Sequence, residues 1–220
     1  MGDQRFADRA DAGRALALRL VDDYYGRDGL LVLGLPRGGV PVAYEVAMAL
    51  EAPLDVFTVR KIGVPGREEL AMGAVASGGA VVMNYEVADM IDIAPREFDE
   101  AAERALAELA RREEVYTRGR PPLRPEGRTV MLVDDGLATG ATMRAAVRAV
   151  SELGPERVVV AVPCAPKSAV RELSAMVDEL VCVSVPPWFQ AVGQCYERFD
   201  QTSDEAVGEL LEAAASRGER

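Results

Sequence analysis

Short apolar runs alternate along the chain with longer segments whose apolar residues recur at helical spacing. The short runs predict strands at residues 30–34, 54–59, 71–76, 80–83, 130–133, 157–163 and 180–185. The longer segments predict helices at residues 5–25, 40–50, 96–118, 143–153, 167–177 and 203–217. Because strands and helices alternate, the pattern indicates an α/β protein with a parallel sheet and helices on both faces.

The 220 residues suffice for one α/β domain with a full core. The proline-rich connector at residues 121–125 is too short to mark a linker, so we expect a single domain over 1–220. In such sheets ligands bind at the carboxyl ends of the strands. The segments that directly follow predicted strands are therefore the ones to search for chemistry.

Composition removes several function classes. The net charge is −11 and no Lys/Arg cluster forms a basic face, so we expect no nucleic-acid partner. No apolar stretch is long enough for a membrane span, and three widely spaced cysteines fit a reducing cytoplasm. The chain has no histidine, which excludes Ser-His-Asp catalysis and imidazole-based zinc sites.

The most informative segment is residues 130–142, VMLVDDGLATGAT. A buried strand ends in Asp134 and Asp135, and a loop of small and hydroxyl residues then leads into a helix. Backbone N–H groups of the loop and the helix N-terminus suit a phosphate, with hydroxyls from Thr139 and Thr142. The acids suit vicinal hydroxyls or a hydrated Mg²⁺. Response regulators also carry an acid pair at a strand end, whereas dehalogenase-type phosphatases need an Asp-x-Asp that this segment lacks.

This segment resembles the phosphoribosyl-diphosphate (PRPP) motif of the type I phosphoribosyltransferases. The resemblance implies the parallel-sheet fold of that family with a small variable cap. It implies that Asp134 and Asp135 bind the ribose hydroxyls and share in catalysis, and that Mg²⁺ is bound through PRPP and these acids. The 5′-phosphate would bind Ala138, Thr139, Gly140, Ala141 and Thr142.

A second strand end carries Arg37, Gly38 and Gly39. The glycines permit close approach of backbone to a ligand, and Arg37 adds a permanent cation with a bidentate fork. The segment resembles the diphosphate loop of the same family, which often contains a non-proline cis peptide. The alternative is an ordinary strand–turn–helix with a solvated arginine.

Residues 59–69 are expected to form a polar loop containing Arg60 and Lys61. They resemble the flexible loop of adenine phosphoribosyltransferases, which implies a lid that closes over the diphosphate through one of these cations. A surface loop with a basic pair is the alternative. The acids that the purine enzymes use at the base are absent, since those positions hold Ala71 and Ala138. Glu68 and Glu69 are nearby substitutes.

Near the C-terminus, residues 186–200 form a possible acceptor-capping segment with Trp188 and Phe189 as acceptor-binding candidates. Gln190 and Tyr196 are further candidates, and the alternative is that these side chains pack the terminal helix onto the sheet.

The resemblance as a whole implies transfer of ribose 5-phosphate from PRPP to a small nitrogen nucleophile with release of diphosphate. The catalytic set would be Asp134, Asp135, Arg37, Arg60 and Lys61, in a cytoplasmic homodimer. One alternative is a non-catalytic regulator that senses PRPP or a nucleotide, and another is hydrolysis or phosphorolysis of a related sugar phosphate.

Overall fold

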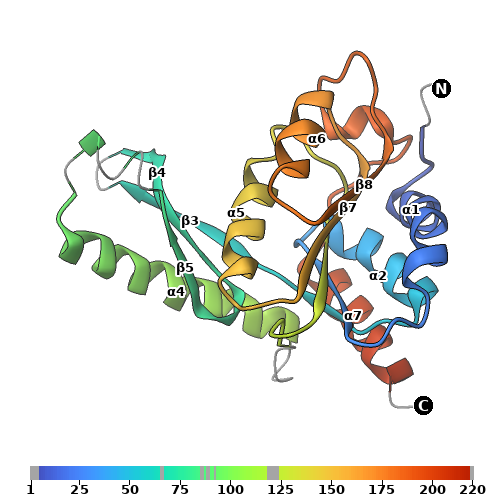
Figure 1. The fold of residues 1–220 in the computed structure, drawn as a ribbon, viewed down its shortest axis with the longest axis horizontal. Helices are drawn as coiled ribbons and strands as arrows, with labels where there is room; N and C mark the ends of the chain where they lie inside the picture. The colour runs from blue at the N-terminus through green and yellow to red at the C-terminus, as the bar shows by residue number, and fades with distance from the viewer. Residues whose placement is uncertain are drawn as a thin grey trace.

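The computed structural model of the chain describes residues 5–64, 67–84, 87, 90, 91, 93–117 and 124–218. Its centre is a five-stranded parallel sheet in the order β2-β1-β6-β7-β8 (Figure 1). The strands are β1 Leu30–Gly34, β2 Leu54–Val56, β6 Thr129–Val133, β7 Arg157–Cys164 and β8 Glu179–Ser184. The predicted α/β class with a parallel sheet is confirmed. Among the described helices, none is long and apolar enough to cross a bilayer.

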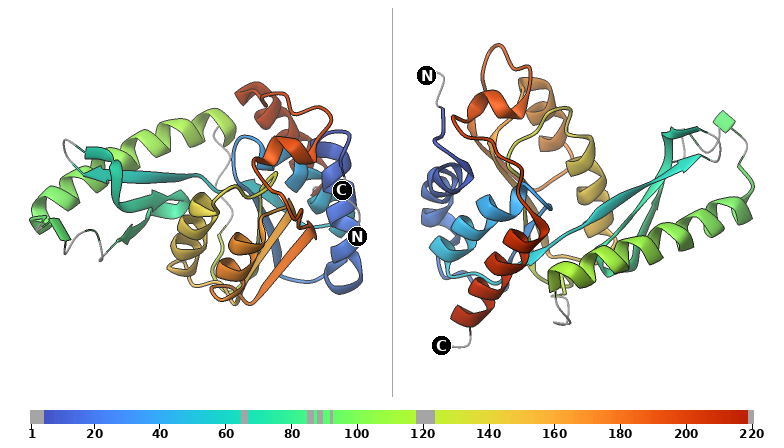
Figure 2. Two further views of the ribbon diagram at one scale, coloured as in Figure 1. Left: turned by 90° about the horizontal axis from the view of Figure 1, so that it is seen from above. Right: turned by 180° about the vertical axis from the view of Figure 1, so that it is seen from behind.

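Helices cover both faces of this sheet (Figure 2). Their bounds are α1 Arg9–Tyr24, α2 Gly39–Leu50, α5 Ala141–Ser151, α6 Lys167–Ser174 and α7 Asp204–Gly218. One apolar core joins α1, α2 and α7 to the sheet, and a second joins α5 and α6 to its other face. Because both faces are covered, strands such as β1 and β6 are buried at every position, which explains why Thr129 is the one polar side chain in these two strands.

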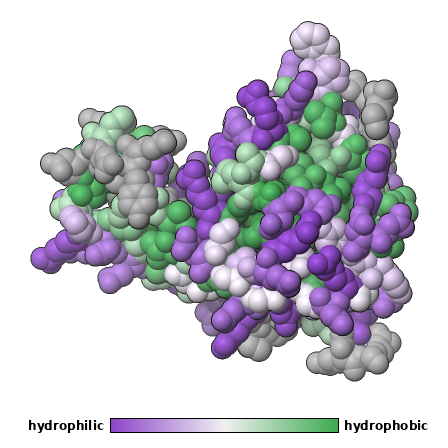
Figure 3. Space-filling model, in the orientation of Figure 1, coloured by the Kyte–Doolittle hydropathy of each residue, from purple (hydrophilic) through white to green (hydrophobic). Residues whose placement is uncertain are grey.

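A three-stranded antiparallel sheet, which we call the arm together with its helix, projects from this body (Figures 1 and 2). It consists of β3 Val59–Val64, β4 Arg67–Ala76 and β5 Ala80–Met83, with the short 3-10 helix η1 Ser77–Gly79 before β5. Helix α4, Pro95–Thr117, covers one face with Phe98, Ala102, Ala105, Leu109 and Tyr116 buried at helical spacing. Hydrophilic side chains line the outer edge of the arm (Figure 3).

The arm corrects one prediction. Residues 59–69 were expected to form a polar loop, but most of them lie in strands β3 and β4, which pair from Val59 with Ala76 to Val64 with Arg67. The segment is extended because its inner side chains, Ile62 and Val64, are buried in the core of the arm. That burial stabilises a hairpin where glycine content alone suggested a loop.

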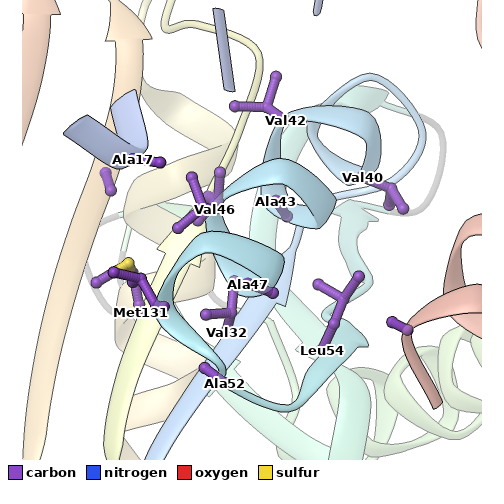
Figure 4. Packing of buried hydrophobic residues seen from close by; sticks show 14 of the residues in the cluster. Ala17, Val32, Val40, Val42, Ala43, Val46, Ala47, Ala52, Leu54 and Met131 are labelled. Carbon is purple, nitrogen blue, oxygen red and sulfur yellow. The ribbon is translucent and has the colours of Figure 1, made fainter. Parts of the chain in front are cut away.

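Helix α2 packs closely on the sheet near the carboxyl ends of the strands (Figure 4). Val46 and Ala47 are fully buried and lie toward Met131 of β6 and Val32 of β1. Small alanine and valine side chains let α2 approach the strands closely, so its N-terminus is fixed relative to the ends of β1 and β6.

β1 and β6 are neighbours in the sheet, but the chain leaves them in opposite directions. β1 leads through α2 to β2 on one side, whereas β6 leads through α5 to β7 on the other. Such a point of diverging connections leaves a crevice at the carboxyl edge of a parallel sheet. The segments after β1 and β6 therefore face each other across the position where a ligand is expected.

Two segments that are far apart in the sequence meet beside this crevice. Residues 5–8 and 195–198, which we call the clasp, are joined by hydrogen bonds from Phe6 N to Cys195 O (2.8 Å), Glu197 N to Phe6 O (2.8 Å) and Arg198 N to Ala7 O (3.0 Å). The clasp adjoins the 3-10 helix η2, Val192–Cys195. Its side chains Phe6 and Tyr196 are buried, so the clasp holds the start of α1 against the end of the sheet.

Candidate active site

The loop between β6 and α5 is shaped by two glycines. Gly136 and Gly140 have φ of 154° and 73°, values that a side chain would oppose. The turn at Gly140 starts α5 at Ala141 with no side-chain cap, while Ala138 and Thr139 are exposed. Thr139 Oγ1 accepts from Ala141 N at 3.3 Å. The helix N-terminus is thus open to solvent, which is the geometry that favours a bound anion.

Asp134 and Asp135 lie directly before this loop, at the end of β6. Asp134 Oδ1 accepts a hydrogen bond from the backbone N–H of Asp135 at 2.8 Å. Burial, reinforced by the charge of Asp135, raises the pKa of Asp134 well above its ordinary value. Burial also raises the pKa of Asp135, against the opposing effect of Arg9. A ligand that donates hydrogen bonds to these two acids, or that carries positive charge beside them, stabilises their ionised form.

Asp135 has a cationic partner that the sequence did not predict. Arg9, the first residue of α1, donates from Nε to Asp135 Oδ2 at 2.8 Å, and both side chains are nearly buried, with exposures of 13% and 14%. The same guanidinium lies 4.1 Å from the centre of the Phe199 ring. Tyr196 Oη donates to the backbone oxygen of Asp135 at 2.5 Å. Asp135 is therefore held by Arg9 and Tyr196 and is not a freely solvated carboxylate.

The segment after β1 packs directly against the acid pair, and we call residues 36–39 the glycine loop. A Cβ on Gly38 would lie 2.1 Å from Asp135 Oδ2, and one on Gly39 would lie 2.7 Å from Val133 O. Only glycine fits at these two positions without displacing the acids or the end of β6. The Pro36–Arg37 peptide is a non-proline cis peptide, the feature that resemblance to the diphosphate loop suggests.

A cavity of about 300 Å³ adjoins the glycine loop on the side of β2. Pro36 and Arg37 line it, and so does Thr142 from the first turn of α5. Arg37 and Thr142, at the end of the loop 136–142, therefore line the same cavity. This places three of the predicted groups — glycine loop, acid pair and loop 136–142 — around a single crevice at the sheet edge.

Arg60 and Lys61 lie elsewhere in the described structure. Arg60 Nη1 is 3.7 Å from Glu108 Oε1 of α4, within the arm. Lys61 lines a separate cavity of about 210 Å³ between the arm and α5, together with Arg144 and Arg148. Neither side chain lines the cavity at Arg37. The side chains of Glu68 and Glu69, and residues 65–66 between the strands, lie outside the described part.

The segment 186–200 divides into two parts. Phe189 packs against the buried cluster of the clasp, which contains no residue of the terminal helix α7. Trp188 is 86% exposed. Its carbonyl accepts from Gln194 Nε2 at 2.9 Å, and the same amide's Oε1 accepts from Gln190 N at 2.9 Å. The loop that carries Trp188 is thus fixed by hydrogen bonds, but no described contact links Trp188 to the acid pair.

Carboxylates are the donors that a hard cation such as Mg²⁺ prefers, so Asp134 and Asp135 fit that ion in type. Within the described residues no group of three or more acid, thiol or imidazole side chains could hold a metal alone. A cation at this edge would accordingly need further oxygen ligands from a bound substrate.

Comparison with known proteins adds three findings. Residues 5–200 match the phosphoribosyl transferase domain family. The chain is 46% identical over 209 residues to a Mycobacterium tuberculosis protein provisionally named as a phosphoribosyl transferase, covering 95% of this chain and 47% of that protein. It is 30% identical over 154 residues to the bifunctional protein PyrR of Leifsonia xyli subsp. xyli, covering 69% of this chain and 67% of that protein.

A solved structure agrees with these matches. The crystal structure of TT1426 from Thermus thermophilus is 47% identical, covers 94% of this chain and 97% of that chain, and superposes with a TM-score of 0.82. The chain spans about half the length of the M. tuberculosis protein. The matched range contains the glycine loop, the acid pair, the loop 136–142 and the clasp. The chain belongs to the phosphoribosyl transferase domain family.

Proposed function

We propose that this protein binds PRPP and transfers its ribose 5-phosphate to a small nitrogen nucleophile, with release of diphosphate. The observation that carries the proposal is the convergence of three segments at one crevice. An open helix N-terminus, two adjacent carboxylates and a glycine loop with a cation correspond in order to the three parts of PRPP: phosphate, ribose and diphosphate.

Each segment has a defined part in this proposal. The loop 138–142 binds the 5′-phosphate through backbone N–H groups and the hydroxyls of Thr139 and Thr142. Asp134 and Asp135 accept from the ribose hydroxyls and favour positive charge on the sugar as the bond to diphosphate breaks. Arg37 and the glycine loop hold the leaving diphosphate. Mg²⁺, when bound with PRPP, supplies charge neutralisation on the diphosphate.

The acceptor enters from the side of the clasp. The clasp lies at the ends of β7 and β8, opposite the cavity at Arg37, so a nucleophile there faces the sugar from the side away from diphosphate. In this proposal residues 186–200 cap the acceptor. Ala71 and Ala138 stand where purine enzymes have an acid, so the acceptor is one that needs no carboxylate at those positions.

One observation favours a second candidate, a non-catalytic protein that senses PRPP. Arg9 neutralises Asp135, and a cation beside the sugar opposes the positive charge that develops there during transfer. A transferase must therefore move Arg9 away from Asp135 during turnover, whereas a sensor need not.

The test is calorimetry with PRPP and Mg²⁺, followed by turnover with a panel of nitrogen nucleophiles. Wild type should bind PRPP, and the double variant Asp134→Asn with Asp135→Asn should lose binding while circular dichroism shows a folded chain. Release of diphosphate that depends on the nucleophile supports transfer. Binding with no turnover of any nucleophile supports the sensor. Unchanged affinity in a folded double variant would refute both.

A further inference from the structure

The cavity at the glycine loop extends beyond the groups that the family motif supplies. It lies at the carboxyl ends of β1 and β2, where Thr58 and its neighbours leave β2 for the arm. Its far wall is formed by Arg112 and Tyr116 of α4 and by Asp204 of α7. Helix α4 follows the strands of the arm in the chain and carries none of the sequence motifs, so Arg112 and Tyr116 were not predicted to line the site.

Arg112 of α4 and Arg37 of the glycine loop both line this cavity, and so does Tyr116. Both guanidinium charges lie near enough to Tyr116 to act to lower its pKa. Burial, followed by the hydrogen bond to Asp204, nevertheless raises the pKa of Tyr116 to about 12, so its hydroxyl remains protonated and donates to Asp204 Oδ1 at 2.9 Å. The carboxylate of Asp204 therefore accepts a hydrogen bond from the uncharged hydroxyl of Tyr116.

Neither Arg37 nor Arg112 forms an ion pair with any described residue, whereas other arginines of α4 do. Arg96 is 2.9 Å from Glu100, and Arg111 is 2.5 Å from Glu108. Two unpaired guanidinium groups facing one cavity repel each other, and an anion between them would remove that repulsion. The 300 Å³ cavity is at the lower end of the range for small-molecule sites, which suits a compact anion.

Thr58 supplies an independent observation in the same wall. It is 7% exposed, and its hydroxyl is buried without a hydrogen-bond partner among the described residues. Its backbone is fixed by Ser77, since Thr58 N donates to Ser77 Oγ at 2.7 Å and Ser77 N donates to Thr58 O at 3.0 Å. A valine would have the same shape without an unsatisfied hydroxyl. Rotation about χ1 exchanges the hydroxyl and methyl positions of a threonine without moving this backbone.

We infer that Arg112 and Thr58 are binding residues for the diphosphate group, acting with Arg37, and that α4 supplies the cation that sequence resemblance assigned to Arg60 or Lys61. The inference rests on the proposed function for the identity of the substrate. The cavity meets the loop 136–142 at Thr142, so a sugar phosphate held there and on the acid pair directs its remaining substituent toward Arg112. Arg60 is held at Glu108 instead.

The experiment compares three ligands by calorimetry in the presence of Mg²⁺: PRPP, inorganic diphosphate and ribose 5-phosphate. Arg112→Gln should weaken PRPP and diphosphate by about 10-fold or more, as expected for loss of a charge-assisted contact, and leave ribose 5-phosphate within about twofold. The matched control is Arg111→Gln, whose side chain is 76% exposed and paired with Glu108, and it should leave all three affinities unchanged.

Thr58→Val is the second variant, and it separates binding from folding. It loses no partner among the described residues, so its melting temperature should equal or exceed that of wild type, while diphosphate affinity falls several-fold. Arg112→Gln binding diphosphate as tightly as Arg111→Gln would overturn the inference, as would an equal loss for ribose 5-phosphate. If wild type binds diphosphate but does not bind PRPP, and Arg112→Gln weakens the diphosphate binding, the proposed function is refuted while the anion site at Arg112 is supported. If wild type binds none of the three ligands, both fail.

Discussion

Substitution of Gly39 by alanine tests how closely the glycine loop must approach the acid pair. The added Cβ would lie 2.7 Å from Val133 O and 2.8 Å from Asp134 Cα, whereas ordinary contacts begin at 3.4 Å. Both neighbours are backbone atoms of the central sheet, so side-chain rotation cannot relieve the overlap. The loop must therefore move away from the end of β6 by roughly 0.7 Å.

The sign of the effect on stability depends on two opposing terms. Overpacking of this kind costs about 1–3 kcal/mol, whereas alanine in place of glycine at the start of α2 returns at most about 1 kcal/mol of helix propensity. We expect the free energy of unfolding to fall by about 1–2 kcal/mol, which lowers the melting temperature of a chain of this length by roughly 2–8 °C. A displacement approaching 1 Å at the reacting centre can lower turnover by up to about 100-fold.

The assay is thermal unfolding together with PRPP calorimetry. Gly79→Ala is the control, because Gly79 has φ of 81° but no atom within 4 Å of an added Cβ. Its backbone strain of about 1–2 kcal/mol should give a comparable loss of stability with PRPP affinity unchanged. A Gly39→Ala protein that melts and binds PRPP like wild type would show that the close approach to β6 is unimportant.

Three further predictions concern charge, metal and specificity. The pKa of Asp134 in the folded state lies above its ordinary 3.8, so the folded protein binds more protons and loses stability as pH rises through the raised range. Asp134→Asn should therefore melt above wild type at about pH 8 and show no gain at about pH 3, and equal melting at the higher pH would contradict this. EDTA should weaken PRPP binding strongly, because it removes the Mg²⁺ that the paired carboxylates of the described site would hold together with the substrate oxygens. A PRPP affinity that calorimetry shows to be independent of metal would contradict this shared site. Adenine, guanine and hypoxanthine should be poor acceptors in steady-state assays, and a kcat/KM on the order of 10⁵ M⁻¹s⁻¹ or above for adenine would argue for a carboxylate such as Glu68 or Glu69 at the base.

Sequence reasoning predicted the parts of the fold that depend on local pattern. The strand before Asp134 and the helix after Thr142 follow from a continuous apolar run and from helical spacing, and both are present. The strands at 71–76 and 80–83 were also predicted, because the glycine turn between them marks a hairpin. That the acid pair and the glycine loop lie at the same edge of the sheet follows from the rule that the carboxyl ends of parallel strands share one edge.

What sequence reasoning missed depends on contacts between distant residues. Arg9 and Asp135 are 126 positions apart, and an arginine at the start of an amphipathic helix has no spacing that marks it as a partner of an acid. Arg112 is one of several charged residues on α4 and differs only by the cavity it faces. The strand β3 was missed because its charged residues and Gly63, followed in the sequence by Pro65 and Gly66, are typical of a polar loop.

The clasp has a consequence for the order in which this protein folds. The β-bridge of the clasp joins Phe6 to Tyr196, so all the residues between these two must fold or form a loop before the bridge can close. Contacts of such wide separation form late, after the helices and the neighbouring strands of the sheet. During synthesis, β6 with its two carboxylates can pair with β1 well before residue 196 leaves the ribosome. Asp135 therefore spends the early life of each molecule without Tyr196, and the cleft acquires its final electrostatic character only when residues 195–198 dock.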